Sequence, residues 1–209
     1  MPDFPSLSLD HYPPHGPMPS EGPKVKPAAT VVIFRNDPKG GAPELLMVQR
    51  AKEMRFAGGA AVFPGGRVDP EDRVLAQKIA PDEDQEIAAA RIAGIRETLE
   101  ETGLLIAARA PVGASEVREA RAMLLEQGAL APVIERFGWE LALEKLVWFA
   151  HWCPPMDGAF DTRFFLTDLG TGAVDIAVDA TENTMLFWAS AARVIELADE
   201  GEILSLIHI

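Results

Sequence analysis

Cysteine, basic residues and long apolar runs are all scarce in this sequence of 209 residues. Its one cysteine is Cys153, so no disulfide can form within the chain, and a reducing, cytoplasmic setting is expected. Lysine and arginine number 19 against 32 aspartates and glutamates, a formal net charge of −13. Neither nucleic acid nor an anionic membrane is therefore expected as a partner. No apolar run reaches the roughly 20 residues that cross a bilayer, and the first residues lack the basic and apolar regions of a signal peptide.

Proline is concentrated at the amino terminus, where residues 1–27 contain eight of the 17 prolines. This composition predicts a disordered arm over residues 1–27. Local docking on the domain is the alternative for Phe4, Leu7, Leu9 and Tyr12. Residues 28–203 are expected to form one domain. The final residues 204–209 match a translated sequencing adapter, so we interpret them as an artefact, with a native apolar tail as the alternative.

The pattern of apolar and polar residues predicts strands with interspersed helices. Strands are expected over residues 28–34, 44–50, 60–63, 104–108, 145–152, 160–169 and 182–188. Helices are expected over residues 69–80, 84–102, 115–127, 132–137 and 189–200. Turn residues between the first two strands predict a hairpin. Because strands and helices do not alternate strictly, we expect an α+β sandwich around a mixed β-sheet.

Three glutamates lie near the end of the helix predicted over residues 84–102: Glu97, Glu100 and Glu101. Their spacing places all three carboxylates on one helix face, where like charges repel unless a cation neutralises them. Clustered carboxylate oxygens are the ligands that Mg²⁺ and Mn²⁺ prefer. A solvated acidic face, partly offset by Arg96, is the alternative that the spacing alone leaves open.

A glycine pair lies upstream of these glutamates, in the segment GGAAVFPGGRVDPED over residues 58–72. The adjacent Gly65 and Gly66 follow a predicted strand, and glycine allows a backbone to approach an anionic group closely. A plain turn is the alternative. A P-loop is excluded because no Gly-Lys-Ser/Thr sequence follows.

Taken together, these segments resemble the box of the Nudix hydrolase family, G-x5-E-x7-R-E-U-x-E-E-x-G-U, where U is a bulky aliphatic residue. The matching residues are Gly65, Glu71, Arg96, Glu97, Glu100, Glu101, Gly103 and Leu104. Two departures stand out. Residues 72–95 form a spacer of 24 residues where the box has seven, and Thr98 occupies an aliphatic position.

A second motif resembles the coenzyme A branch of the same family, whose acyl-coenzyme A diphosphatases carry a comparable insertion. That motif is LLTxR-S-x3-R-x3-G-x3-FPGG, and residues 46–66 reproduce its spacing. The matching positions are Arg50, Arg55, Gly59, Phe63, Pro64, Gly65 and Gly66. Guanidinium groups bind phosphate well, so Arg50 and Arg55 are expected to hold substrate phosphate. Pairing of these arginines with Glu44 or Glu53 is the alternative.

The resemblance implies a Nudix-type α/β/α sandwich around a mixed β-sheet. It also implies a metal-dependent enzyme that hydrolyses coenzyme A or acyl-coenzyme A to adenosine 3′,5′-bisphosphate and (acyl-)phosphopantetheine. The implied residues are Glu97 and Glu182 for catalysis, Glu97, Glu100 and Glu101 for Mg²⁺ or Mn²⁺, and Arg50, Arg55, Gly65 and Gly66 for substrate. Asp179 is the alternative to Glu182. A pyrophosphatase for ADP-ribose or a dinucleotide, and a binding module without turnover, are the other functions considered. The expected partner is a small-molecule nucleotide, and a homodimer is left open.

Two further groups of residues are interpreted structurally. The sequence His151-Trp152-Cys153 lacks both a second pair of metal ligands and a base for the thiol, so a buried strand end is expected. Aromatic residues alternate along the strands over residues 145–152 and 160–169, and most are expected in the core, with one or two available to flank an adenine or acyl group. These are Trp148, Phe149, Trp152, Phe160, Phe164 and Phe165.

Overall fold

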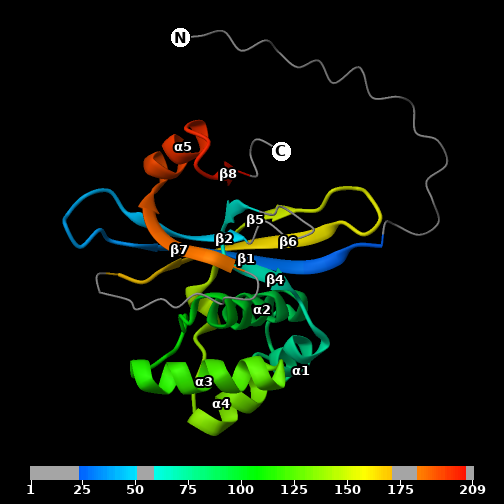
Figure 1. The fold of residues 1–209 in the computed structure, drawn as a ribbon. Helices are drawn as coiled ribbons and strands as arrows, with labels where there is room; N and C mark the ends of the chain where they lie inside the picture. Colours follow the sequence, from blue (N-terminus) through cyan, green and yellow to red (C-terminus); the bar gives the residue numbers. More distant parts are fainter. Residues whose placement is uncertain (1–23, 51–58, 171–182, 206–209) are drawn as a thin grey trace, which may run out of the picture.

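The computed structural model describes residues 24–50, 59–170 and 183–205. A mixed sheet lies between helices α1–α4 on one face and α5 on the other (Figure 1). The strands are β1 (Lys26–Arg35), β2 (Glu44–Arg50), β3 (Ala60–Val62), β4 (Gly65–Arg67), β5 (Val147–Trp152), β6 (Phe160–Asp168), β7 (Asn183–Ser190) and β8 (Leu204–Ser205). The helices are α1 (Pro70–Ile79), α2 (Gln85–Thr102), α3 (Ala114–Gln127), α4 (Leu130–Phe137) and α5 (Ala191–Asp199), with a 3-10 turn, η2 (Leu143–Lys145). The predicted α/β/α sandwich around a mixed sheet is confirmed.

Strand β1 organises the sheet, whose order is β5-β6-β1-β2-β3-β8, with β4 also paired to β1 and β7 to β2. β1 runs parallel to β6 and antiparallel to β2 and β4. The register of Phe34 with Leu45 confirms the predicted hairpin. In its turn, the Asp37 carboxylate accepts backbone hydrogen bonds from Lys39 and Gly41. β1 begins inside the range predicted as an arm, and residues 1–23 and 206–209 lie outside the described residues.

Helix α2 has the ends that its sequence predicts. The Asp84 side chain caps it by accepting hydrogen bonds from two backbone N–H groups of the first turn. It ends at Gly103, whose φ of 69° is left-handed and costs glycine little. The fully buried side chains Ile92, Ile95 and Leu99 belong to the main core, together with residues of β1 and β6. Among the described residues, no helix combines the length and the apolar character that crossing a bilayer requires.

Two segments differ from the predicted secondary structure. The strand predicted over residues 104–108 is absent, and only an isolated bridge joins Ala108 to Leu141. The left-handed φ of 55° at Ala107 interrupts the extended backbone there. Conversely, Gly65, for which a plain turn was the alternative, begins strand β4. This glycine lies so close to β1 that a Cβ atom would overlap the carbonyl oxygen of Ala29.

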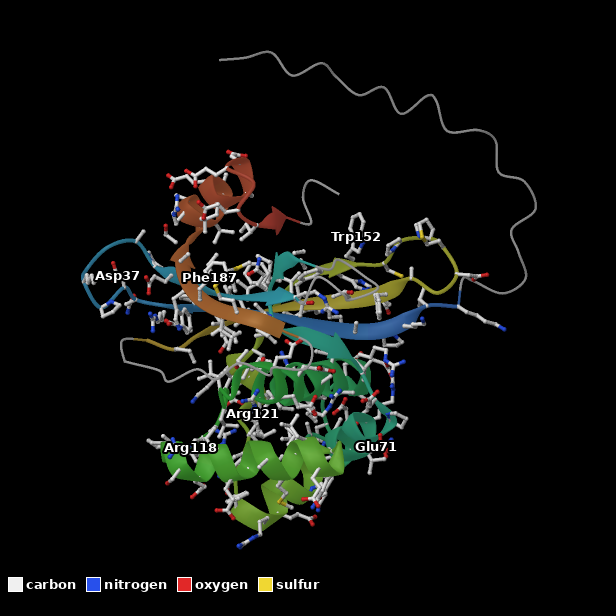
Figure 2. The ribbon with its side chains drawn as sticks, viewed as in Figure 1. Asp37, Glu71, Arg118, Arg121, Trp152 and Phe187 are labelled. Carbon is white, nitrogen blue, oxygen red and sulfur yellow. The ribbon has the colours of Figure 1, made fainter. Side chains whose placement is uncertain are left out.

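The aromatic residues of β5 lie outside the core, so the prediction that they are buried is wrong. All six residues of this strand are exposed, and Trp152 points away from α1–α4 (Figure 2). Cys153 is exposed as well, which contradicts the buried strand end predicted for residues 151–153. On β6, Phe165 is fully buried, whereas Phe160 is exposed. The reason is position: β5 is an edge strand, and alternation buries a side chain only where another layer covers it.

Candidate active site

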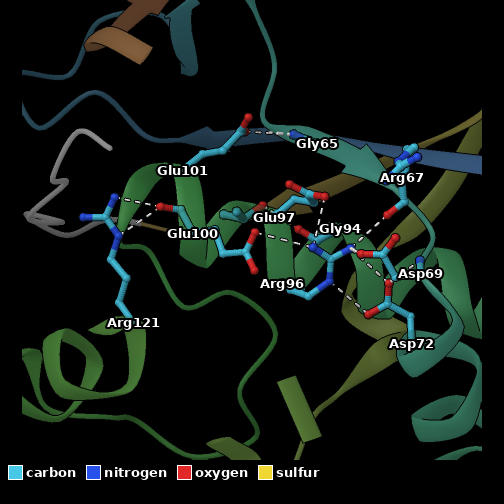
Figure 3. Close-up of polar contacts among 11 residues, drawn as sticks. Gly65, Arg67, Asp69, Asp72, Gly94, Arg96, Glu97, Glu100, Glu101 and Arg121 are labelled. Atoms are coloured by element: carbon cyan, nitrogen blue, oxygen red, sulfur yellow. Dashed lines mark hydrogen bonds and ion pairs between the residues drawn. The ribbon is translucent and has the colours of Figure 1, made fainter. Parts of the chain in front are cut away.

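Helix α2 brings its glutamates next to the glycine pair of β4 (Figure 3). The Glu101 carboxylate accepts a hydrogen bond of 3.1 Å from the backbone N–H of Gly65, and this glutamate is only 7% exposed. Glu97 lies against Gly66, where a Cβ atom would overlap its carboxylate. The structure thus joins two motifs that lie 31 or more residues apart in the chain, and a side chain on the second glycine would displace the Glu97 carboxylate.

A buried arginine, Arg96, connects this cluster to α1. Its guanidinium donates two hydrogen bonds of 3.1 Å to the Asp72 carboxylate and one of 2.8 Å to the carbonyl of Arg67. Its remaining nitrogen lies 3.0 Å from a Glu97 oxygen and 3.4 Å from a Glu100 oxygen. Burial alone would lower the pKa of Arg96, but the neighbouring carboxylates hold this pKa well above its ordinary value. Arg96 is therefore fully charged and orients the glutamates.

Among the described residues, Arg96 is the cation that pairs with Glu97 and Glu100. Burial raises the pKa of Glu97 to about 7, the Arg96 charge opposes this rise and the Glu100 charge adds to it. Burial also raises the pKa of Glu100. Within the described ranges, no three His, Cys, Asp or Glu side chains lie close enough to form a metal-binding group. The donor chemistry nevertheless fits Mg²⁺ or Mn²⁺, because the hard carboxylate oxygens of Glu97 and Glu101 lie beside the glycine pair of β4.

The polar residue at an aliphatic position of the motif is accommodated within α2. Thr98 is fully buried, and its hydroxyl donates a hydrogen bond of 2.7 Å to the carbonyl of Gly94. Gly94 allows α2 to pack tightly on β1, since a Cβ atom there would lie 2.7 Å from a methyl group of Val31. This close packing holds α2 near the sheet, so that the Glu97 and Glu101 side chains reach β4.

The long spacer in the motif forms helices rather than an extended loop. Residues 72–95 make up most of α1 and the first half of α2, and Arg73 joins the two helices through two hydrogen bonds to Glu86. Glu71, which matches the motif, is exposed at the start of α1 and lies outside the cluster. Its neighbour Asp72 enters the cluster instead, as part of a capping box with Asp69. An Asp-x-x-Asp pattern before an apolar run could have revealed this cap.

The predicted phosphate-binding arginines have different outcomes. Arg50 ends β2 at a shift in register, and its Nε is buried without a hydrogen-bond partner in the described part of the chain. Of the two alternative partners of Arg50, Glu44 pairs with Arg35 at 2.8 Å, and Glu53 lies outside the described residues. Arg55 and Glu182 lie outside the described residues.

One contact beside the cluster had no signal in the sequence. Arg121 of α3 donates two hydrogen bonds, of 2.7 and 3.0 Å, to the carbonyl of Glu100 (Figure 3). This arginine lies 21 residues beyond that glutamate, on a helix whose packing only the folded chain reveals. The contact holds α3 against the last turns of α2, which carry the glutamates.

The fold of this chain is similar to solved structures over most of its length. A Nudix hydrolase from Alicyclobacillus acidocaldarius superimposes with a TM-score of 0.71 and 28% identity, covering 88% of this chain and 87% of that one. A MutT/nudix family protein from Enterococcus faecalis (TM-score 0.47, 17% identity, 80% and 44% covered) and an Ap4A hydrolase from C. elegans (0.44, 19%, 85% and 89%) are too distant to carry an argument. No protein-family model and no curated protein matches significantly. The predicted enzyme class is confirmed: the chain is an enzyme with the Nudix hydrolase fold.

Proposed function

We propose that this chain is a Mg²⁺- or Mn²⁺-dependent diphosphatase acting on coenzyme A and acyl-coenzyme A. The observation that carries the proposal is the placement of the α2 carboxylates, Glu101 bonded to the N–H of Gly65 and Glu97 against Gly66, beside the glycine pair of β4. The reaction adds water across the diphosphate and releases adenosine 3′,5′-bisphosphate and (acyl-)phosphopantetheine. The coenzyme A assignment is supported by the spacing of residues 46–66.

Within this proposal, Glu97, Glu100 and Glu101 hold the divalent cation. When bound, that cation neutralises diphosphate oxygens and lowers the pKa of a water molecule. The candidate bases for the proton of that water are Glu97 and Glu182. In the metal-free chain burial raises the pKa of Glu97 to about 7, and a bound cation favours its ionised form. Arg96 acts through the carboxylates and not on the substrate, because its nitrogens are already bonded to protein oxygens.

Phosphate binding is assigned to the glycine pair and to the arginines of the second motif. The small residues of β4 leave backbone accessible beside the carboxylates. Arg50 supports this role: its buried Nε has no hydrogen-bond partner among the described residues, and an anionic ligand would satisfy it. Arg55 completes the pair in the motif.

A hydrolysis panel read by product mass tests the proposal. The purified chain is incubated with coenzyme A, an acyl-coenzyme A, ADP-ribose, NADH and a diadenosine polyphosphate, in Mg²⁺, Mn²⁺ or EDTA. Phosphopantetheine that forms only with metal is the expected result. A preference for ADP-ribose or NADH would reject coenzyme A and retain the diphosphatase. No turnover of any substrate would favour a binding module.

Substitution of the arginines tests the substrate assignment. Arg50→Ala and Arg55→Ala are each expected to raise KM for coenzyme A about tenfold, because each removes a charge-assisted phosphate contact. Arg193→Ala is the matched control. Arg193 is an arginine of α5 that pairs with Glu196 and Glu200 and belongs to neither motif. Equal KM values in all three variants would remove the motif from the substrate assignment.

A further inference from the structure

The hairpin formed by β5 and β6 (residues 147–168) gathers much of the exposed apolar surface. Eleven large apolar side chains are exposed in the described part of the chain, and six of them belong to this hairpin. The six are Val147, Trp148, Phe149, Trp152, Met156 and Phe160. Single exposed apolar residues are ordinary, whereas a contiguous apolar patch marks an interaction surface. The hairpin is therefore the candidate for such a surface.

One side of the hairpin lies away from the main helical layer. Cross-strand partners point to the same side of a sheet, so Trp152 shares a side with Thr162, opposite to the fully buried Phe165. Figure 2 shows Trp152 pointing away from α1–α4. Among the described helices, only α5 lies on that side, and it packs on β2 and β7. The aromatic surface of the hairpin is thus left outside both helical layers.

Strand β5 also has a free backbone edge. It is the first strand in the sheet order, and among the described strands only β6 pairs with it. Its outward N–H and C=O groups are available to another strand. Edge strands are commonly protected by lysine, proline or an inward-pointing charge, and the sequence VWFAHW of β5 contains none of these. This edge can therefore accept a further strand.

The lack of charge on β5 favours a second copy of this chain as its partner. Residues 146–156 contain no Asp, Glu, Lys or Arg, although the whole chain has a net charge of −13. Two copies that meet at β5 avoid bringing carboxylates together. A strongly charged partner would find no complementary charge on this strand, whereas apolar rings and a free strand edge are complementary to the same features of a second copy.

The exposed apolar area is sufficient for a weak dimer. An aromatic side chain has about 150–250 Å² of surface, so exposed fractions of 38–65% leave roughly 450 Å² on the four aromatic residues of each copy. Two copies would bury about 900 Å² from these rings. Val147 and Met156 bring the total near the roughly 1,200 Å² at which specific interfaces begin. Interfaces of this size form weak complexes.

We propose that two copies of this chain associate through the β5–β6 hairpin, with their β5 edges paired antiparallel and their aromatic side chains packed together. The same surface is used on both copies, so the assembly closes as a two-fold dimer. A Kd of about 1–100 μM is expected for so small an interface, and β5 is then in solvent in dilute solution. The inference is independent of the proposed function, since the hairpin contains none of the residues assigned to metal or substrate.

Sedimentation velocity of the full chain between about 1 and about 300 μM tests the association without requiring turnover. A change from monomer to dimer is expected over this range. Added salt should lower Kd about two- to fivefold, because it screens the repulsion between two acidic copies and does not weaken apolar contacts. A chain that stays monomeric at every concentration would overturn the proposal, and so would a dimer that dissociates in salt.

Charged substitutions locate the interface. Trp152→Asp and Phe149→Asp are each expected to raise Kd at least about thirtyfold, because each removes an aromatic contact and places like charges on both copies. Val74→Asp on α1 is the matched control: Val74 is 67% exposed, Trp152 is 65% exposed, and the added charge is the same. Circular dichroism identifies variants that fold. An unchanged Kd in a folded hairpin variant would place the interface elsewhere and reject the proposal.

The single cysteine provides a distance across the same interface. Cys153 directly follows β5 and is exposed, so one nitroxide can be attached to each copy without a substitution. Six strand residues rise about 20 Å, so antiparallel pairing of the β5 edges should place the two labels within about 40 Å of each other. Pulsed dipolar spectroscopy is expected to show this distance at high protein concentration and to lose it on dilution. A longer distance in the dimer would contradict pairing through β5.

Discussion

Helix α2 and strand β5 reverse the usual relation between polarity and burial. Arg96 and Glu101 on α2 are charged, yet they are 4% and 7% exposed. Trp148 and Trp152 on β5 are aromatic, yet they are 45% and 65% exposed. The helix lies between the sheet and α1, whereas the strand is the outer edge of the sheet. Position in the sandwich, rather than side-chain type, therefore decides burial in both regions.

The energetic consequences of these two arrangements differ. Burying charge is unfavourable unless partners converge on it, so the contacts made by Arg96 are essential to the α2 region. Removing an exposed aromatic side chain from an edge strand changes the free energy of unfolding only slightly. Substitutions in α2 should consequently have large effects and those in β5 small ones.

The largest effect is expected from Arg96→Ala. This change leaves Asp72 buried without its cation, which should lower the free energy of unfolding by about 3–5 kcal/mol. Urea unfolding followed by circular dichroism measures the loss. Arg193→Ala, on the exposed surface of α5, is the control and should change stability by less than about 0.5 kcal/mol. Similar losses in the two variants would refute the central role of Arg96.

Loss of a glutamate from the cluster should impair catalysis more than folding. Glu100→Gln and Glu101→Gln are each expected to reduce kcat about 10²–10³-fold, or about 3–4 kcal/mol on the barrier, because a neutral amide is a poor metal ligand. Metal-dependent release of product measures the effect. Glu119→Gln on exposed α3 is the matched control. Full activity in both cluster variants would remove these residues from the metal site.

The buried Glu97 predicts a pH dependence of stability in the metal-free protein. Its pKa rises from 4.5 in the unfolded chain to about 7 in the folded one, chiefly because it is buried. Between these values the folded state binds a proton that the unfolded state releases, so raising the pH through this window destabilises the fold. The loss should reach up to about 3 kcal/mol.

Urea unfolding in EDTA at about pH 5 and about pH 8 measures this loss. Because other carboxylates also titrate, the quantity to compare is the difference between wild type and Glu97→Gln, in which the contribution disappears. Saturating Mg²⁺ should reduce the loss, since a bound cation favours the ionised carboxylate. The same slope in both proteins would contradict the assignment to Glu97.

The smallest effect is expected on β5. Trp152→Ala should change the free energy of unfolding by less than about 0.5 kcal/mol, because the indole is largely in solvent. Phe165→Ala on the neighbouring β6 is the contrasting variant and should cost about 3–5 kcal/mol, since this ring is fully buried. Thermal unfolding of both variants compares them, and equal shifts in Tm would mean that β5 is covered in solution.

Local chemistry accounts for the elements that sequence analysis predicted well. Asp84 and Gly103 mark the ends of α2 through contacts with their own helix, so neighbouring residues contain the information. The prediction of a strand over residues 104–108 was wrong because the left-handed backbone at Ala107 depends on the surrounding fold. The prediction that the β5 aromatic residues are buried was wrong because alternation distinguishes the two faces of a strand but does not show which face another layer covers.

The sequence by itself determined the carboxylate face of α2, the glycine pair, the ends of α2 and most strands and helices of the mixed-sheet fold, because each follows from a local pattern along the chain. Only the tertiary structure decided that Arg96 pairs with Asp72, that Arg121 reaches the carbonyl of Glu100, and that β5 lies at an edge. Those features join residues far apart in the chain, and their energies depend on which surfaces the packed layers remove from water.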